Sequence, residues 1–321
     1  MRNNITIKGM AELLKSRDNI LILTHAFPDG DTLGCAYGLA LALQKLGKKA
    51  RVVCPDEIAA RYDYMIEPLI KQTFKDPFVV SVDIADLALI DRLRSEYEGR
   101  VDLSIDHHPS NKRFAKYNYV KCEAAACELV YRLIKALDVD IDSNIAAALY
   151  TGIATDTGCF RFSNTSVNTL RIAAALMACG APCADINRVM FDTKSRSRLE
   201  VERGALNDME FFCGGRCAIT AITAEMIARA NAADDELEGI TALPRSVEGV
   251  LLGITMRERE PGVYKISMRS HEPINVSELC GSFGGGGHTR AAGCQMSGSL
   301  QEVTERLKSA ACEFVKRAEK A

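Results

Sequence analysis

The sequence predicts an α/β protein whose N-terminal part is a mainly parallel sheet flanked by helices. Two observations support this fold class. Apolar runs such as residues 19–25 and 78–82 have the length and composition of strands that are buried on both faces. Helix-like stretches separate these runs, among them residues 32–46, which Gly47 closes. Strands that alternate with helices along the chain form parallel sheets.

The other N-terminal elements follow the same alternation. A short amphipathic helix is expected near residues 10–16, and a loop at 26–31 follows the first strand. Further strands are expected at 50–54 and 101–105, and a helix at 144–150 runs into a polar segment that ends it. We therefore expect an open sheet with helical connections.

The chain after residue 156 becomes mostly helical. Its helices are expected at residues 166–179, 183–192 and 195–211. The last of them carries interspersed charges of both signs at 195–203, which is typical of a solvated helix face rather than a nucleic-acid patch. Because Gly214 and Gly215 follow, this helix is expected to connect two domains.

The C-terminal part predicts a smaller α/β domain with a mixed sheet. Its strands are expected at 216–223, 249–257 and 262–269, and its final helix at 300–320. A chain of 321 residues also exceeds the size at which one core stops growing. The expected organisation is an N-terminal domain over 1–192, a helical linker over 193–213 and a C-terminal domain over 214–321.

Composition narrows the class of protein. With a net charge of −2 and a pI near 6.3, the chain offers no general surface for long nucleic acid. No signal peptide or membrane-spanning stretch is visible, and twelve scattered cysteines are typical of reduced core thiols, so we expect a cytoplasmic protein without membrane contact. The pairs Cys179/Cys183 and Cys213/Cys217 have the spacing of half a zinc site, but helix-spaced core cysteines are the preferred interpretation.

Polar residues that bind metals fall where the predicted strands end. Asp106, His107 and His108 directly follow the run 101–105, and Asp83 directly follows the run 78–82. The other candidates at such positions are His25, Asp29, Asp31 and Asp156. Ligands of open α/β sheets bind at the carboxyl ends of strands, so these side chains are expected to converge.

Each of these residues also has a structural interpretation. Residues 28–31 alone form an ordinary turn, Asp83 alone can cap a helix, and residues 155–158 can simply end one. The joint pattern favours a site, because independent turns need not all supply carboxylate or imidazole groups at strand ends. Such a set can hold two divalent cations if one carboxylate bridges them, and mixed carboxylate and imidazole ligands favour Mn²⁺, with Mg²⁺ or Co²⁺ as alternatives. Two such ions activate water for phosphoester hydrolysis.

Four segments resemble, in order and spacing, the motifs of the DHH phosphoesterase superfamily. They are His25-Ala26-Phe27-Pro28-Asp29-Gly30-Asp31, the single Asp83, Asp106-His107-His108 and Gly152-Ile153-Ala154-Thr155-Asp156. Two further segments, Ser267-Met268-Arg269-Ser270 and Phe283-Gly284-Gly285-Gly286-Gly287-His288 with Ala291-Ala292-Gly293, resemble the DHH-associated C-terminal domain of the nanoRNase and pAp-phosphatase branch. The resemblance covers nearly the whole chain.

The resemblance implies a role for each matched residue. One metal is expected at His25, Asp29 and Asp83, and the other at Asp31, Asp83, His107 and Asp156, with Asp83 as the bridge. Asp106 is expected to orient the imidazole beside it, and His108 to face the scissile phosphate. The catalytic candidates are therefore His108, Asp83 and Asp106.

The C-terminal motifs predict a phosphate clamp. Consecutive glycines expose backbone N–H groups, so Gly285, Gly286 and Gly287 allow a phosphate to approach closely. Arg269 offers bidentate contacts and His288 a hydrogen bond. A glycine run by itself is as often a flexible loop. His271, two residues after Arg269, is interpreted as part of a surface loop, with a place at the border of the substrate cleft as the alternative.

The function that the resemblance implies is hydrolysis of oligoribonucleotides a few residues long to mononucleotides, and of pAp to AMP. The alternative within this chemistry is a cyclic di-AMP or pApA phosphodiesterase. A single-strand DNA exonuclease and a catalytically inactive nucleotide-binding sensor are less favoured interpretations. The resemblance also implies a homodimer, and the absence of tryptophan leaves little for a platform on which long strands stack.

Overall fold

A computed structural model describes residues 3–237 and 239–319, and the chain divides into two compact units. The first ends at Thr193 and the second begins at Lys194. Both are α/β structures, as the sequence predicted.

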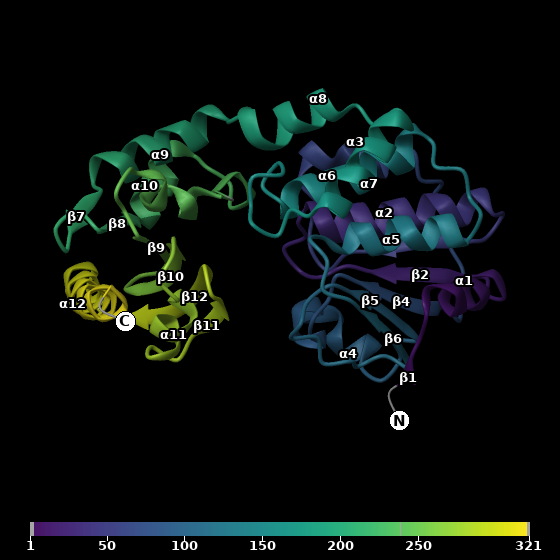
Figure 1. The fold of residues 1–321 in the computed structure, drawn as a ribbon, viewed down its shortest axis with the longest axis horizontal. Coiled ribbons are helices and arrows are strands. Elements are labelled where there is room, and N and C mark those ends of the chain that lie inside the picture. The colour runs from purple at the N-terminus through teal and green to yellow at the C-terminus, as the bar shows by residue number, and fades with distance from the viewer. Residues whose placement is uncertain (1–2, 238, 320–321) are drawn as a thin grey trace. The chain divides into compact units, whose positions relative to one another are not determined.

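The first unit contains a six-stranded sheet in which all strand pairs are parallel (Figure 1). In spatial order the strands are β1 (Asn3–Asn4), β6 (Tyr117–Val120), β5 (Leu103–Asp106), β4 (Phe78–Val82), β2 (Ile20–Leu23) and β3 (Ala50–Val53). The expected strands at 19–25, 50–54, 78–82 and 101–105 all lie in this sheet. The sequence did not predict β1 and β6, which extend one edge.

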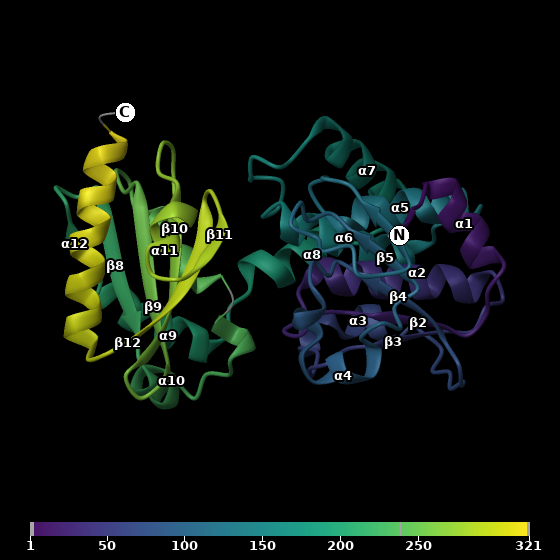
Figure 2. The same ribbon diagram turned by 90° about the horizontal axis from the view of Figure 1, so that it is seen from below.

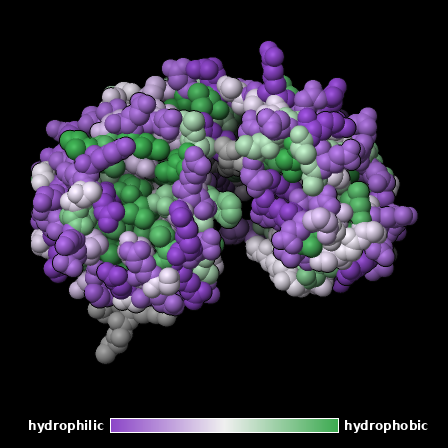
Figure 3. All heavy atoms as spheres, turned by 180° about the vertical axis from the view of Figure 1, so that it is seen from behind, coloured by the Kyte–Doolittle hydropathy of each residue, from purple (hydrophilic) through white to green (hydrophobic). Residues whose placement is uncertain are grey.

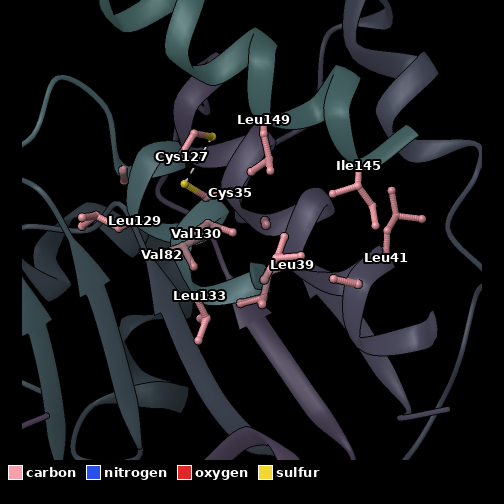
Figure 4. Packing of buried hydrophobic residues seen from close by; sticks show 14 of the residues in the cluster. Cys35, Leu39, Leu41, Val82, Cys127, Leu129, Val130, Leu133, Ile145 and Leu149 are labelled. Atoms are coloured by element: carbon pink, nitrogen blue, oxygen red, sulfur yellow. Dashed lines mark hydrogen bonds between the residues drawn. The ribbon is translucent and has the colours of Figure 1, made fainter. Parts of the chain in front are cut away.

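Long helices cover one face of this sheet. They are α1 (Ile7–Lys15), α2 (Gly30–Lys45), α5 (Ala126–Ala136), α6 (Ser143–Asp156) and α7 (Val167–Ala178), with α8 (Cys183–Asn187) after them. Figure 4 shows Leu39 of α2, Val130 and Leu133 of α5 and Leu149 of α6 packed together in the core. Gly152 lets α6 pack closely against α2 and α5, since a Cβ atom there would lie 3.0 Å from the Cα atom of Asp31 in α2 and 2.3 Å from Sγ of Cys127 in α5.

The other face has only short helical segments. They are α3 (Asp63–Ile66), α4 (Arg94–Tyr97) and 3₁₀ turns at Ala60–Tyr62 and Leu87–Leu93. Leu87, Ile90 and Tyr97 nevertheless pack with Leu21 and Val79 into a second apolar cluster. The connections on this face are thus shorter than the full helices that strict alternation predicts.

The second unit contains a mixed six-stranded sheet. In spatial order its strands are β11 (Gly286–His288), β12 (Ala291–Ser297), β10 (Val263–Ser270), β9 (Leu252–Glu260), β8 (Cys217–Ile222) and β7 (Glu210–Phe212). Only β8 and β9 pair in parallel. The predicted mixed sheet is confirmed.

Helices lie on both faces of this second sheet. On one face α12 (Leu300–Ala318) and α11 (Val276–Gly281) share a core with residues such as Ile266 and Met268 (Figure 2). On the other, α9 (Arg196–Asn207) packs Val201 and Ala205 against Ile222 of β8, and α10 (Ala224–Ala230) lies beside α9.

The helix expected over 195–211 ends earlier than predicted. It stops at Asn207, and residues 210–212 form β7, which pairs with β8. The segment expected as a linker over 193–213 therefore contributes a helix and a strand to the second unit, because the apolar side of α9 is buried there.

The surface is mixed in character. Figure 3 shows hydrophilic residues interspersed with smaller hydrophobic patches on the face that it presents. None of the helices in residues 3–237 and 239–319 has the length and apolar character that a membrane span requires.

Candidate dimetal site

The carboxyl edge of the parallel sheet gathers the predicted ligands of the first unit. His25 follows β2, Asp83 follows β4, and His107 follows β5, so the three strands place these side chains at one edge. The other three predicted ligands, Asp29, Asp31 and Asp156, come from helix ends. Asp29 caps α2, accepting hydrogen bonds from the backbone N–H groups of residues 31 and 32, and Asp156 is the last residue of α6.

Asp31 differs in position from its prediction. It lies in the first turn of α2 rather than in the loop before it, and it is fully buried. Its two carboxylate oxygens accept hydrogen bonds from the backbone N–H groups of Ala126, at 2.6 Å, and Cys127, at 2.9 Å. These amides lie at the start of α5, so two helix N-termini fix the orientation of this carboxylate.

Asp83 lies at the centre of the cluster, with one carboxylate oxygen toward each of two imidazoles. Its Oδ2 is 3.7 Å from Nε2 of His25, and its Oδ1 is 3.4 Å from Nε2 of His107. His25 is also 3.7 Å from Asp29, and His107 is 3.4 Å from Asp156. Two sets of three side chains, His25/Asp29/Asp83 and Asp31/His107/Asp156, thus have the spacing of metal ligands.

The two imidazoles are held in the orientation of metal ligands. Nδ1 of His25 lies 2.8 Å from the carbonyl of Ala26, and Nδ1 of His107 lies 3.1 Å from the carbonyl of Glu123. Because a carbonyl can only accept, each Nδ1 carries the proton and each Nε2 faces the carboxylates. Histidines that bind metals commonly donate their other N–H to a carbonyl in this way. A neutral Nε2 and a carboxylate repel each other unless a cation or a proton lies between them.

The electrostatics of the cluster show an excess of negative charge. Burial lowers the pKa of His25, but Asp29 and Asp83 outweigh burial and raise its pKa to about 11. Burial is likewise outweighed at His107, where Asp83 and Asp31 raise the pKa to about 11. Burial, followed by the charge of Asp83, raises the pKa of Asp31 to about 6.

Within the described part of the chain, one buried carboxylate oxygen has no hydrogen-bond partner that compensates its negative charge. Oδ1 of Asp83 is inaccessible to solvent and has no hydrogen-bond partner among the described residues. Protons on the imidazoles compensate part of the charge, and divalent cations at the same positions would compensate more of it. The donor set therefore fits two metal ions, which Asp83 would share.

Asp106 acts on a different ring from the one expected. We predicted that it orients the adjacent imidazole, His107, yet its Oδ1 accepts from Nδ1 of His108 at 2.8 Å. The same oxygen accepts from the backbone N–H of His107, and Oδ2 accepts from the amide of Asn111 at 2.6 Å. The carbonyl of Glu123 holds His107 instead. No sequence pattern points to Asn111 or Glu123, because both lie in irregular segments that approach the site only in the folded chain.

The C-terminal candidates meet in one row of the second sheet. His288 of β11 is paired with Ala291 of β12, and Ala291 is paired with Arg269 of β10. Residues that face each other across strands point to the same side, so Arg269 and His288 flank a single methyl group. Gly286 and Gly287 belong to β11 rather than to a free loop. No Cβ atom fits at Gly285, where it would lie 2.2 Å from the carbonyl of Gly293.

A parallel α/β sheet with carboxylates and imidazoles at its carboxyl edge is an arrangement that suits a metal-dependent hydrolase. The family follows from comparison with known sequences. Residues 19–153 match the DHH family, N-terminal domain, and residues 217–317 match the DHHA1 domain. The chain belongs to the DHH family of phosphoesterases.

Relatives match along almost the whole chain. The bifunctional oligoribonuclease and PAP phosphatase NrnA of Thermus thermophilus is 35% identical, over 96% of this chain and 94% of that protein. The cyclic-di-AMP phosphodiesterase GdpP of Bacillus subtilis is 26% identical over 98% of this chain but only 50% of its own length. Among solved structures, an exopolyphosphatase-related protein from Bacteroides fragilis has a TM-score of 0.87 and 27% identity, covering 98% of this chain and 97% of that one.

Proposed function

We propose that this protein uses two divalent cations to hydrolyse oligoribonucleotides of a few residues to mononucleotides and to remove the 3′-phosphate of pAp. The observation that carries the proposal is the position of Asp83, whose two oxygens face two different imidazoles. The names of the NrnA relatives supply the substrate class, since they are called oligoribonuclease and PAP phosphatase.

The proposed ligands divide into two sets. One ion would be held by His25, Asp29 and Asp83, and the other by Asp31, Asp83, His107 and Asp156. Mn²⁺ is the proposed ion, because mixed carboxylate and imidazole ligands suit it better than Mg²⁺. When bound, such a pair of ions lowers the pKa of water and stabilises charge on the attacking and leaving oxygens.

His108 is proposed to contact the scissile phosphate. Asp106 binds its Nδ1, which leaves Nε2 for a substrate oxygen. Burial lowers the pKa of His108, but the hydrogen bond to Asp106 and the charge of Asp83 outweigh burial and raise it. A protonated imidazole donates a hydrogen bond to a phosphoryl oxygen and stabilises the charge that develops there.

Arg269 and His288 are proposed to bind a phosphate of the substrate that is not being cleaved. Their common row brings a guanidinium and an imidazole to the same side of the sheet, where both can donate hydrogen bonds to one phosphate. A net charge of −2 supports short substrates over long nucleic acid. The homodimer stays a prediction, which size-exclusion chromatography with light scattering tests.

A cyclic di-AMP or pApA phosphodiesterase is the second candidate function. The resemblance to GdpP supports it, although this chain spans only half of that protein. The experiment offers pAp, pApA, a five-nucleotide RNA and cyclic di-AMP in parallel to the purified protein with Mn²⁺, and repeats each reaction with EDTA. We expect metal-dependent hydrolysis of pAp and the RNA. Faster turnover of cyclic di-AMP would favour the second candidate, and no hydrolysis of any substrate would leave a nucleotide-binding sensor.

A further inference from the structure

One face of the second sheet carries more positive charge than its acidic residues balance. Lys265 and Arg269 lie four residues apart on β10, so their side chains point to the same side of the sheet. The alternate residues Ile266 and Met268 belong to the core that α12 covers. Lys265 and Arg269 therefore lie on the opposite face, the one that carries His288 at its edge strand.

Arg245 joins this face beside Arg269. Gly253 of β9 is the cross-strand partner of Arg269, and a Cβ atom on Gly253 would lie only 2.5 Å from the backbone nitrogen of Arg245. The glycine thus lets the turn that carries Arg245 lie directly on the sheet, next to Arg269. Burial, followed by the charge of Arg245, lowers the pKa of Arg269. Arg245 also lines, with His271, a depression of about 430 Å³, which is large enough for a nucleoside.

The nearby acidic group is already engaged. Asp234 binds both Arg257 and Arg259, the latter at 2.6 Å. Lys265 lies directly opposite Arg257 in the sheet, so three positive charges, those of Lys265, Arg257 and Arg259, lie near the single carboxylate of Asp234. Burial and the charges of these two arginines lower the pKa of Lys265. Within residues 3–237 and 239–319, neither Lys265 nor Arg245 nor Arg269 forms an ion pair with a carboxylate.

We propose that this face holds two phosphates of one oligoribonucleotide, the first at Arg269 and Arg245 and the second at Lys265. This inference rests on the proposed function and adds a length preference to it. The two positions on β10 are about 13 Å apart along the strand, at about 3.3 Å per residue. The two phosphates of pAp are separated by a single ribose and reach only the first position. A strand of several nucleotides reaches both and gains a further charged contact.

The test compares how much each variant lowers kcat/KM for substrates of different length. We would measure kcat and KM with Mn²⁺ for pAp and for RNAs of two, three and five nucleotides. Lys265→Gln should lower kcat/KM for the five-nucleotide RNA about tenfold relative to pAp, mainly through KM, since one charged hydrogen bond is removed. Arg245→Gln should lower kcat/KM for all substrates by similar factors of about ten. Arg306→Gln, which removes an exposed charge on α12, is the matched control and should leave the ratios as they are.

Two outcomes would overturn the inference. If the ratio of RNA turnover to pAp turnover is unchanged in Lys265→Gln, Lys265 does not bind a second phosphate. If the KM values of Arg245→Gln equal those of the unmodified protein, Arg245 does not contribute to the first phosphate position. Melting temperature and bound metal are measured for each variant, so that loss of folding is recognised. If the unmodified protein hydrolyses none of these substrates, the proposed function fails. Binding of a fluorescent five-nucleotide RNA then still tests the face, because equal affinity in Lys265→Gln would refute it.

Discussion

The backbone conformation of Asp83 places its carboxylate at the centre of the site. Its φ of +55° is a left-handed conformation, which Asp and Asn adopt more readily than most residues. The turn comes directly after β4, so the carboxylate lies between residues from β2 and β5 instead of continuing along its own strand. Both the conformation and the charge therefore limit what can replace it.

Asp83→Asn should remove the charge of this side chain without disturbing the fold. Asn tolerates the same backbone conformation but presents one uncharged oxygen, so it cannot serve two cations. We expect kcat for pAp to fall by at least about 100-fold, beyond the cost typical of residues that only support a ligand. Bound Mn²⁺ should also fall, while the circular dichroism spectrum stays that of the unmodified protein.

Asp106→Asn is the matched control for this prediction. Its carboxylate holds His108 and the backbone of the neighbouring residue, not a metal position. The control should keep its metal and lose about 10- to 100-fold in kcat. Equal metal content in Asp83→Asn and the unmodified protein would contradict the bridging role of Asp83.

At the scale of elements, the buried strands of the first sheet and the polar residues after them were predictable from sequence. A continuous apolar run has a defined length, and the residue after it must lie at the carboxyl edge. Helix boundaries were less predictable. The loop at 26–31 was expected to precede a helix at Thr32, but Asp29 caps the helix two residues earlier and brings Asp31 into its first turn.

The row that joins Arg269 and His288 could not be predicted. It depends on β11, which consists of two glycines and a histidine and has no intrinsic preference for a strand. Its register comes from pairing with β12, a contact that only the folded sheet provides. The glycine run was recognised as a phosphate-binding candidate, whereas its place on a sheet edge required the structure.

The anchoring of α9 gives a prediction about stability. Glu202 on this helix binds Lys194 and Arg198, each at 2.8 Å, and is nearly buried. Burial raises the pKa of Glu202, but hydrogen bonds from these two cations outweigh burial and lower it. Glu202→Gln should destabilise the second unit by about 1 kcal/mol at pH 7, a fall in melting temperature of roughly 3 °C.

The sign of the pH dependence follows from the lowered pKa. The carboxylate of Glu202 stabilises the folded state above the ordinary Glu pKa of about 4.3 and stops doing so as pH falls through its lowered value. The gap in melting temperature between Glu202→Gln and the unmodified protein should therefore close across an acidic series. Glu200→Gln is the control, since Glu200 pairs with Arg203 on the exposed side of the same helix. An equal gap at every pH would show that the effect is not electrostatic.

At the scale of the whole molecule, the apolar core is divided in the same way as the chain. Three clusters of buried residues belong to the first unit and two to the second, and none of these five combines residues of both. Buried apolar area is the main source of cooperative stability. Separate cores predict two unfolding transitions in the calorimeter rather than one.

Metal binding should move only one of these transitions, because the proposed ligands lie between residues 25 and 156 of the first unit. A ligand that binds the folded state at 100 times its Kd stabilises that state by about 2.7 kcal/mol. Adding Mn²⁺ after EDTA treatment should therefore raise one melting temperature by roughly 5 °C or more and leave the other in place. The shift should be largely absent in Asp83→Asn, whereas Glu202→Gln should lower the transition that Mn²⁺ does not move. A single transition that responds to both changes would show that the two units unfold as one.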